Sequence, residues 1–284
     1  MAEIIDGKLV SRLEKEKIKE ETDLFREKYG VSPGLAVILV GNDPASAVYV
    51  RNKHKACLEV GFSSFEITMP DTVSEEELIE KIRELNSDSS VHGILVQLPL
   101  PRTINEWRVI NSIDPRKDVD AFHPSNVGRI MIGNYSMLPC TPAGVITLLD
   151  HYGIEISGKR CVVVGRSNIV GKPVAHLLLE RNGTVTVCHS RTVDLASHTS
   201  VADILVVAVG RAKFITAEHV KEGAVVIDVG INRDGDGKLC GDVDFDSVKD
   251  KASFITPVPG GVGPMTIATL MKNTLRAAKE LLEG

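Results

Sequence analysis

Apolar runs alternate with segments of helical spacing through the first half of the chain. Residues 34–40 and 93–98 are nearly unbroken apolar runs, which are typical of parallel strands buried on both faces. Another short strand is expected at residues 65–69. Helices are expected around these strands, at residues 7–28, 45–60 and 74–86, the last opening on a capping box of Ser74 and Glu77. This order predicts a βαβ series.

The second half repeats the alternation after a stretch of irregular composition. Residues 114–139 are rich in Pro, Gly, Asn and Asp, which indicates a domain boundary or a functional loop. Thr141 followed by Pro142 predicts a helix start, and this helix should end before Gly153. Beyond it, strands are expected at residues 160–164, 184–188, 204–208 and 225–229. A final helix is expected at residues 265–282. The chain is therefore predicted to be α/β, with a second doubly wound unit at about residues 140–260.

The composition is that of an average globular chain and excludes several classes of protein. The 284 residues are 43% hydrophobic, 25% charged and 4% aromatic, and the formal net charge is −5. Because Lys and Arg form no long run and aromatic residues are few, no nucleic-acid partner is expected. The sequence offers no apolar stretch of about 18 residues, so no membrane span is expected. The charged N-terminus differs from a secretory signal.

Cysteine and histidine usage gives no indication of a disulfide framework or a metal site. The five cysteines are odd in number, widely spaced and without a CxxC pair. This pattern is typical of packed thiols in a reducing compartment, and we expect a cytoplasmic protein. The eight histidines are scattered without an HxxxH or HExxH pair, so no metal is expected.

A glycine turn between a strand and a helix is the first candidate site. Residues 162–173 read Val-Val-Val-Gly-Arg-Ser-Asn-Ile-Val-Gly-Lys-Pro, with Gly165 and Gly171 at the outer positions of a dinucleotide-binding turn. Ser167 takes the place of the middle glycine, so the match is imperfect. An ordinary turn between a strand and a helix explains this segment nearly as well.

The next strand decides the expected cofactor. It ends near Cys188, where a site for NAD usually carries an acid for the ribose 2′-hydroxyl, but here Ser190 and Arg191 follow. Together with Arg166 in the glycine turn, these side chains would hold a 2′-phosphate that a carboxylate would repel. We therefore expect NADP. The alternative is that both arginines are ordinary solvated surface charges.

A lysine on a largely apolar helix face is the second candidate. Lys53 shares its face with Tyr49, Cys57 and Val60, while Arg51, Lys55 and Glu59 form a separate charged stripe. Desolvation and the neighbouring cations Arg51 and Lys55 would both lower its pKa. Such a lysine can serve as an acid, a base or an electrostatic stabiliser. On pattern alone, a side chain that reaches past the edge of the face to water is favoured.

Four further polar residues could accompany this lysine. Tyr49, one turn earlier, could hydrogen-bond a shared ligand or pack as an amphipathic core aromatic. Gln97 interrupts an apolar strand, so it either satisfies backbone groups or points into a site at the carboxyl end of that strand. Asp120 and its neighbour Asp118 could equally serve turn chemistry or a local salt bridge.

The segment at residues 256–266 combines rigid Pro with permissive Gly directly before the last helix. Its central stretch, Pro259 to Gly263, could bring backbone groups close to a ligand. A plain linker rarely needs this much turn chemistry.

Taken together, these segments resemble one family, the methylenetetrahydrofolate dehydrogenase/methenyltetrahydrofolate cyclohydrolase enzymes of one-carbon metabolism. The similarity runs essentially from end to end, and its long segments are highly specific. They include Tyr49-Val-Arg-Asn-Lys53-His-Lys55 and Lys117-Asp-Val-Asp120-Ala-Phe-His123. The others lie at residues 93–101, 139–144, 165–171 and 257–266. No departure occurs at the matched catalytic positions.

The resemblance implies roles that the pattern alone only allows. It implies a catalytic Lys53, with Tyr49 and Gln97 arranging the lysine and the substrate, and Asp120 as the anchor of the pterin ring. It implies that the folate side is lined by Pro259, Gly260, Gly261, Val262 and Gly263. It implies contacts to NADP from Gly165, Arg166, Ser167, Ser190 and Ile231. The position of Arg191 directly after the strand that ends near Cys188 adds this residue to the predicted set.

The resemblance also implies two α/β domains flanking a cleft, and a homodimer joined through the nucleotide domain. The expected domains are a folate-binding domain at 1–139, completed by a returning helix at 264–284, and a Rossmann-type NADP domain at 140–263. The implied activity is oxidation of 5,10-methylenetetrahydrofolate with NADP⁺, followed by hydrolysis to 10-formyltetrahydrofolate. The alternatives are a monofunctional dehydrogenase and a catalytically silent NADP-binding protein on the same fold.

Overall fold

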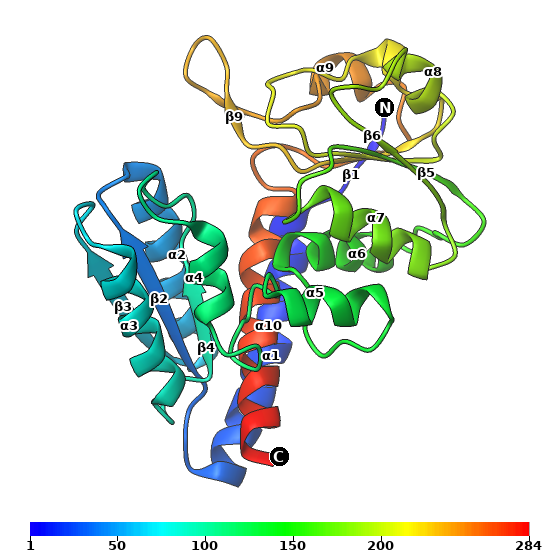
Figure 1. Ribbon diagram of the computed structural model, residues 1–284. Helices are drawn as coiled ribbons and strands as arrows, with labels where there is room; N and C mark the ends of the chain where they lie inside the picture. The colour runs from blue at the N-terminus through cyan, green and yellow to red at the C-terminus, as the bar shows by residue number, and fades with distance from the viewer. Residues whose placement is uncertain (284) are drawn as a thin grey trace. The chain divides into compact units, whose positions relative to one another are not determined.

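The computed structural model describes residues 1–283 and divides them into two compact units (Figure 1). Unit 1 comprises Met1–Ser11 and Thr141–Thr266, and unit 2 comprises Arg12–Cys140 and residues 267–283. Each unit is a parallel sheet with helices packed against it, which confirms the predicted α/β class. No helix within residues 1–283 is long and apolar enough to cross a membrane.

The first eleven residues belong to a different unit from the one that the sequence predicted. We predicted residues 1–139 in one domain, whereas Met1–Ser11 group with unit 1. The physical reason is that β1 (Glu3–Ile4) pairs in parallel with β11 (Phe254–Ile255) and extends the sheet of unit 1. Two hydrogen-bonded residues of strand are enough to place the segment there, but they are too short to give a sequence pattern.

Unit 2 is built on a three-stranded parallel sheet in the order β3-β2-β4. Its strands are β2 (Gly34–Val40), β3 (Ser63–Met69) and β4 (Gly93–Val96). Alternate side chains of β2 enter different cores: Leu35, Val37 and Leu39 face one, and the residues between them face the other. Both faces of this strand are covered, which explains its unbroken apolar run.

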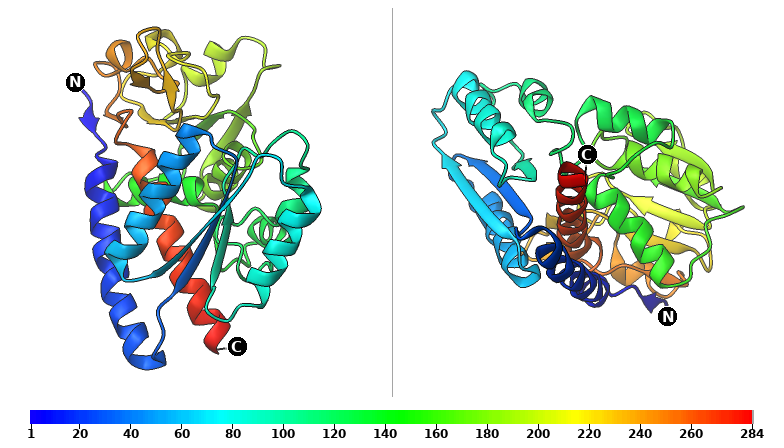
Figure 2. Two further views of the ribbon diagram at one scale, coloured as in Figure 1. Left: turned by 90° about the vertical axis from the view of Figure 1, so that its left-hand side faces the viewer. Right: turned by 90° about the horizontal axis from the view of Figure 1, so that it is seen from below.

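Helices cover both faces of this sheet. The helices that lie wholly or mainly in unit 2 are α1 (Gly7–Tyr29), α2 (Pro44–Val60), α3 (Glu75–Ser87), α4 (Glu106–Ser112), α5 (Pro124–Met131) and α10 (Val262–Glu283). The first core contains residues of α1, α2 and α10, and the second contains residues of α3 and α4. Within unit 2, α1 and α10 run side by side (Figure 2), joined by ion pairs of Lys279 with Glu21 and of Lys28 with Glu283.

Unit 1 is built on a six-stranded parallel sheet in the order β1-β11-β8-β7-β5-β6. Besides β1 and β11, its strands are β5 (Arg160–Val164), β6 (Thr184–Cys188), β7 (Ile204–Val207) and β8 (Val225–Asp228). The chain passes from β5 outward to β6 and then returns to β7 on the other side of β5. The topological switch point therefore lies between β5 and β7, where open α/β sheets bind ligands beyond the carboxyl ends of the strands.

Shorter elements complete unit 1. Its helices are α6 (Cys140–His151), α7 (Gly171–Glu180), α8 (Leu195–Thr199), α9 (Phe245–Val248) and the 3₁₀ turn η1 (Ala217–His219). The strands β9 (Asn232–Arg233) and β10 (Leu239–Cys240) form an antiparallel pair. All five cysteines of the chain are buried and free, as their spacing predicts.

The sequence prediction fails mainly in the stretch between the two halves. Residues 114–139 contain α5, and Asp118 forms a parallel bridge with Ile94 at the edge of β4. The helix expected to begin at Pro142, with Thr141 as its cap, begins two residues earlier, at Cys140. By contrast, the capping box of Ser74 and Glu77 is present, with hydrogen bonds in both directions.

Candidate functional site

The Lys53 side chain is buried and paired in unit 2. It is 8% exposed, and its Nζ donates a 2.9 Å hydrogen bond to Gln97 Oε1. Gln97 stands just beyond the end of β4, and its Nε2 donates to the carbonyl of Leu98 at 2.7 Å. A single amide therefore both satisfies a backbone group and fixes the lysine. The surface-lysine alternative is wrong, because the side chain meets Gln97 rather than water.

The environment of Lys53 disfavours its charged form relative to a lysine in water. Burial lowers the pKa of Lys53, and the nearby Asp120 carboxylate and Cys140 oppose that shift. Arg51 and Lys55, which we expected to contribute, lie on the exposed stripe of α2 and are not among the causes of the pKa shift. Burial alone therefore moves the lysine toward the range where an amine can exchange protons with a substrate.

Asp120 is held at the carboxyl end of the sheet by its neighbours. Asp118 is buried and accepts hydrogen bonds from the His123 N–H at 2.7 Å and from Asn126 Nδ2 at 2.8 Å. Between Asp118 and His123, Ala121 adopts a φ of 55°, a left-handed conformation that is costly for alanine. Asp118 thus performs turn chemistry, whereas Asp120 is half-buried and forms no ion pair among residues 1–283.

Two residues beside Asp120 were not identified from the sequence as parts of a site. Cys140 is fully buried; burial raises its pKa well above the usual range, and the adjacent Asp120 carboxylate adds to the effect. Asn273 of α10 donates from Nδ2 to the carbonyls of Val119 and Leu138, both at 2.8 Å. It thereby fixes the two backbone segments that precede Asp120 and Cys140. An amide on an otherwise apolar helix face was the available signal.

Tyr49 lies one turn before Lys53 on α2 and is exposed. Its hydroxyl forms no hydrogen bond with any other described residue. This exposure disagrees with the core-aromatic alternative. The hydroxyl remains available to a ligand.

The glycine turn of unit 1 has the close approaches that a dinucleotide site requires. A Cβ added at Gly165, whose φ is 128°, would lie 2.2 Å from the carbonyl oxygen of Ala208 beyond β7. A Cβ at Gly171, the first residue of α7, would lie 2.3 Å from the Gly165 oxygen. Both positions therefore require glycine. Ser167 Oγ accepts from the N–H groups of Val170 and Gly171, each at 3.2 Å, at the start of the helix.

The candidate 2′-phosphate residues follow neighbouring strands. Arg166 follows β5, while Ser190 and Arg191 follow β6, and Val164 is in register with Cys188 at the ends of these two strands. All three side chains are exposed, and neither guanidinium has an ion pair within residues 1–283. Both guanidinium groups thus follow the carboxyl ends of adjacent strands and lack a carboxylate partner within residues 1–283.

Ile231 and the Pro–Gly segment meet at the same edge of unit 1. Ile231 is exposed beyond β8, and a Cβ at Gly263 would lie 3.7 Å from its Cδ1. Gly260 has a φ of 108°, and the Gly261 carbonyl oxygen approaches so closely that a Cβ at Gly7 would lie 1.7 Å from it. The segment 257–263 is therefore a tightly packed turn rather than a plain linker. Pro259 and Val262 lie in the same segment.

The predicted residues thus fall into two groups. Tyr49, Lys53, Gln97 and Asp120 lie in unit 2, and the residues assigned to the cofactor lie in unit 1 with Pro259–Gly263. Within residues 1–283, no group of three or more His, Cys, Asp or Glu side chains is arranged to hold a metal ion.

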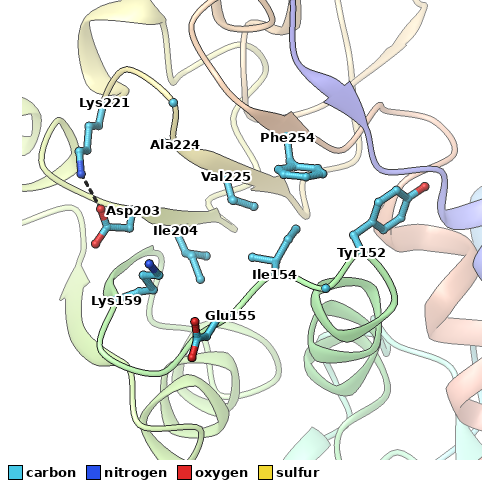
Figure 3. Close-up of a pocket in the computed structure, with 12 residues that line it drawn as sticks. Tyr152, Ile154, Glu155, Lys159, Asp203, Ile204, Lys221, Ala224, Val225 and Phe254 are labelled. Atoms are coloured by element: carbon cyan, nitrogen blue, oxygen red, sulfur yellow. Dashed lines mark hydrogen bonds and ion pairs between the residues drawn. The ribbon is translucent and has the colours of Figure 1, made fainter.

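A hollow in unit 1 lies at the opposite edge of its sheet from the cofactor candidates (Figure 3). It has a volume of about 300 Å³ and is lined by residues at the amino ends of the strands, among them Ile204, Val225 and Phe254. The ion pair of Lys221 with Asp203, at 2.5 Å, borders it. Ligands of doubly wound sheets bind at the opposite, carboxyl edge, so we assign no substrate to this hollow.

Comparisons with known proteins agree on one family. Residues 5–120 match the model of the tetrahydrofolate dehydrogenase/cyclohydrolase catalytic domain, and residues 139–282 match the model of its NAD(P)-binding domain. A bifunctional protein FolD of Streptococcus thermophilus is 58% identical over 100% of both chains. One from Halalkalibacterium halodurans is 61% identical over 98% of this chain and 99% of its own.

Solved structures give the same result. The FolD methylenetetrahydrofolate dehydrogenase/cyclohydrolase of Campylobacter jejuni superposes with a TM-score of 0.97 at 50% identity, covering 99% of this chain and 100% of its own. The Trypanosoma brucei enzyme, solved with NADP cofactor and an inhibitor, gives a TM-score of 0.96 at 42% identity. It covers 100% of this chain and 99% of its own.

Proposed function

Because the chain belongs to the tetrahydrofolate dehydrogenase/cyclohydrolase family, we propose that the buried Lys53–Gln97 pair carries its hydrolytic chemistry. The enzyme is bifunctional. It oxidises 5,10-methylenetetrahydrofolate to 5,10-methenyltetrahydrofolate with NADP⁺ and hydrolyses the product to 10-formyltetrahydrofolate. We also propose that unit 2 binds the folate and that unit 1 binds NADP.

The hydride step needs alignment more than chemical groups of the protein. NADP⁺, when bound, supplies the acceptor for a hydride from the one-carbon bridge. The chain's part is to hold the two ligands in register, since orientation alone can lower a barrier by several kcal/mol. Gly165, Gly171 and Ser167 support a cofactor site, because they form a turn in which the backbone at the start of α7 can approach a phosphate.

The hydrolytic step needs proton transfer at the bridge carbon. Neutral Lys53 Nζ can accept a proton from water as the water oxygen bonds to the methenyl carbon. The resulting ammonium can then donate to the ring nitrogen as the bond from that nitrogen to the bridge carbon breaks, while the hydroxyl on the bridge carbon releases its proton to solvent and becomes the formyl C=O. Gln97 Oε1 holds Nζ in place for both transfers through the 2.9 Å hydrogen bond. The lowered pKa of Lys53 supports this role, because burial makes the neutral amine easier to reach than for a lysine in water.

Asp120 is proposed as the anchor of the pterin ring. Its carboxylate can accept two hydrogen bonds from the ring N–H and amino groups. The geometry that supports this is the absence of an ion pair for Asp120 within residues 1–283, together with a backbone held by Asp118 and Asn273. Tyr49, with its free hydroxyl on the same helix as Lys53, is proposed to contact the same ligand.

Selectivity for the 2′-phosphate is proposed to come from Arg166, Ser190 and Arg191. The two guanidinium groups are exposed and unpaired within residues 1–283, so an anion can reach them without breaking an existing contact. Ile231 is proposed to contact the cofactor from the loop after β8, and Pro259–Gly263 to line the folate side.

We further propose a homodimer that joins two copies through strand β6. This strand ends the sheet of unit 1, and its Val187 is 40% exposed. An exposed edge strand with apolar side chains readily pairs with a second copy. Val187→Lys should shift the protein to monomer in sedimentation velocity. Val201→Lys, which changes a 43% exposed valine away from the edge, should leave the dimer intact.

A cytoplasmic location is proposed on the evidence of the cysteines. Five buried, unpaired thiols are typical of a reducing compartment.

A single assay tests the proposed function against its alternatives. Purified protein is mixed with 5,10-methylenetetrahydrofolate and NADP⁺, and methenyl formation and decay are followed by absorbance. Formation with enzyme-dependent decay is expected. Formation without decay would indicate a monofunctional dehydrogenase, and neither would indicate a silent NADP-binding protein.

A further inference from the structure

Two buried carboxylates in unit 1 have no part in the chemistry described so far. Asp228, the last residue of β8, is 3% exposed, and Asp242, two residues after β10, is fully buried. Neither has an ion pair within residues 1–283. A buried carboxylate without a cation is costly unless hydrogen-bond donors surround it.

Asp242 meets that requirement by binding two separate loops. Its Oδ2 accepts from the N–H groups of Val209 at 2.6 Å and Gly210 at 3.0 Å, in the loop after β7. Its Oδ1 accepts from the Arg211 N–H and from Asn232 Nδ2, both at 2.8 Å. One carboxylate therefore ties the loop after β7 to Asn232, the first residue of β9, where the loop after β8 ends.

Asp228 supports this arrangement from behind. Its Oδ1 accepts from the N–H groups of Gly230 at 3.0 Å and Asp242 at 2.9 Å, and its Oδ2 accepts from Val243 N–H at 2.9 Å. Its own N–H donates to Thr256 Oγ1 at 2.7 Å, directly before the 257–263 segment. The two acids thus link four chain segments, at residues 209–211, 228–232, 242–243 and 256.

Two glycines allow the acids to come this close to the backbone. A Cβ at Gly230 would lie 2.3 Å from Asp242 Oδ1, and a Cβ at Gly241 would lie 1.8 Å from Asp228 Oδ2. Ile231 is consequently fixed on both sides, with Gly230 bonded to Asp228 and Asn232 bonded to Asp242.

We propose that Asp242, supported by Asp228, is a positioning residue that sets the loops after β7 and β8 against NADP and thereby determines cofactor affinity. The inference rests on the proposed function, specifically on the assignment of Ile231 to the cofactor site. This positioning role differs from a general folding role, because the hydrogen bonds of Asp242 go to the loop after β7 and to Asn232 after β8. None of these hydrogen bonds involves Lys53 or the residues around it in unit 2.

The test is Asp242→Asn. An asparagine offers one acceptor oxygen and turns an amide donor toward two of the donors that Asp242 now satisfies. Calorimetric titration of the purified protein with NADP⁺ should show the Kd raised about 10- to 150-fold, the value of one charge-assisted hydrogen bond. The KM for NADP⁺ should rise with it, while the KM for 5,10-methylenetetrahydrofolate should stay unchanged. Cyclohydrolase activity on added methenyl substrate consumes no NADP⁺ and should also be unchanged.

Asp203→Asn is the matched control. Asp203 lies at the opposite end of the same strand β7, accepts from the Arg160 N–H at 2.8 Å, and pairs with Lys221 beside the hollow of Figure 3. The Asp203→Asn substitution removes a carboxylate that binds the backbone of the same unit, away from the carboxyl edge of the sheet. It should leave the affinity for NADP⁺ unchanged.

Each outcome decides between the possibilities. An unchanged Kd for NADP⁺ in Asp242→Asn overturns the inference, and so does an equal loss of cofactor affinity and cyclohydrolase activity, which would indicate a purely structural role. If this variant fails to fold, Asn232→Ala releases only the loop after β8. It should weaken NADP⁺ binding with cyclohydrolase activity retained; unchanged binding refutes the inference. A wild-type protein that does not bind NADP⁺ would overturn the proposed function itself.

Discussion

Replacing Lys53 with Met should separate catalysis from stability. The methionine keeps most of the apolar stem of the lysine and removes the ammonium group, whose hydrogen bond to Gln97 Oε1 measures 2.9 Å. General acid–base assistance is typically worth about 10²- to 10⁴-fold. Cyclohydrolase activity should therefore fall by at least that range, or about 2.7 to 5.4 kcal/mol in activation free energy. Dehydrogenase activity, which depends mainly on alignment, should be reduced but measurable.

The same substitution should change the free energy of unfolding far less. Gln97 Oε1 loses its donor, which costs about 1–3 kcal/mol for a buried acceptor and less for one that water can reach. Against this, the folded protein no longer buries an 8% exposed ammonium, whose desolvation already lowers its pKa. The two effects oppose one another, and a net change within about 1 kcal/mol is expected.

The assay follows both steps on one preparation. Methenyl formation and decay are recorded by absorbance, and urea unfolding gives the stability. Lys55→Met is the matched control, because it makes the same chemical change on the exposed stripe of the same helix and should alter neither activity. A folded Lys53→Met protein that hydrolyses the methenyl substrate at a near-normal rate would refute the catalytic role of this lysine.

Three other results are expected. Asp120→Asn, which turns a donor toward the donors of the pterin, should abolish detectable folate binding in calorimetry while NADP⁺ binding persists; unchanged folate affinity would remove Asp120 from the site. Neutral replacement of Arg166 or Arg191 should weaken NADP⁺ binding by roughly 1–3 kcal/mol and leave NAD⁺ unaffected, whereas equal losses for both cofactors would show that neither arginine recognises the 2′-phosphate. Burial raises the pKa of Asp118 from 3.8 to about 6. Between about pH 4 and pH 6, the native state therefore retains a proton that the unfolded chain has lost. Stability should therefore fall as pH rises from 4 to 6, by at most about 3 kcal/mol, and Asp118→Asn should remove that slope in urea titrations; a slope unchanged by the substitution would contradict the raised pKa.

Local patterns in the sequence were sufficient for the α/β class and for most regular elements. The run at residues 34–40 predicted a strand covered on both faces, and the Ser74–Glu77 capping box marked a helix start. The family and its candidate residues also followed from contiguous motifs. In each case the information lies within a few neighbouring residues, where backbone geometry and side-chain spacing are coupled directly.

Only the tertiary structure decided what depends on residues far apart in the chain. Lys53 could be read as a surface residue until Gln97, 44 positions later, was found to accept its hydrogen bond. Asn273 acquires its role from carbonyls more than a hundred residues earlier, and the acids at 228 and 242 from loops that the sheet brings together. The sequence determined which groups were present. Folding determined which of these groups were buried and which groups they hydrogen-bonded. Burial and hydrogen bonding in turn set the pKa of a lysine and the position of a carboxylate.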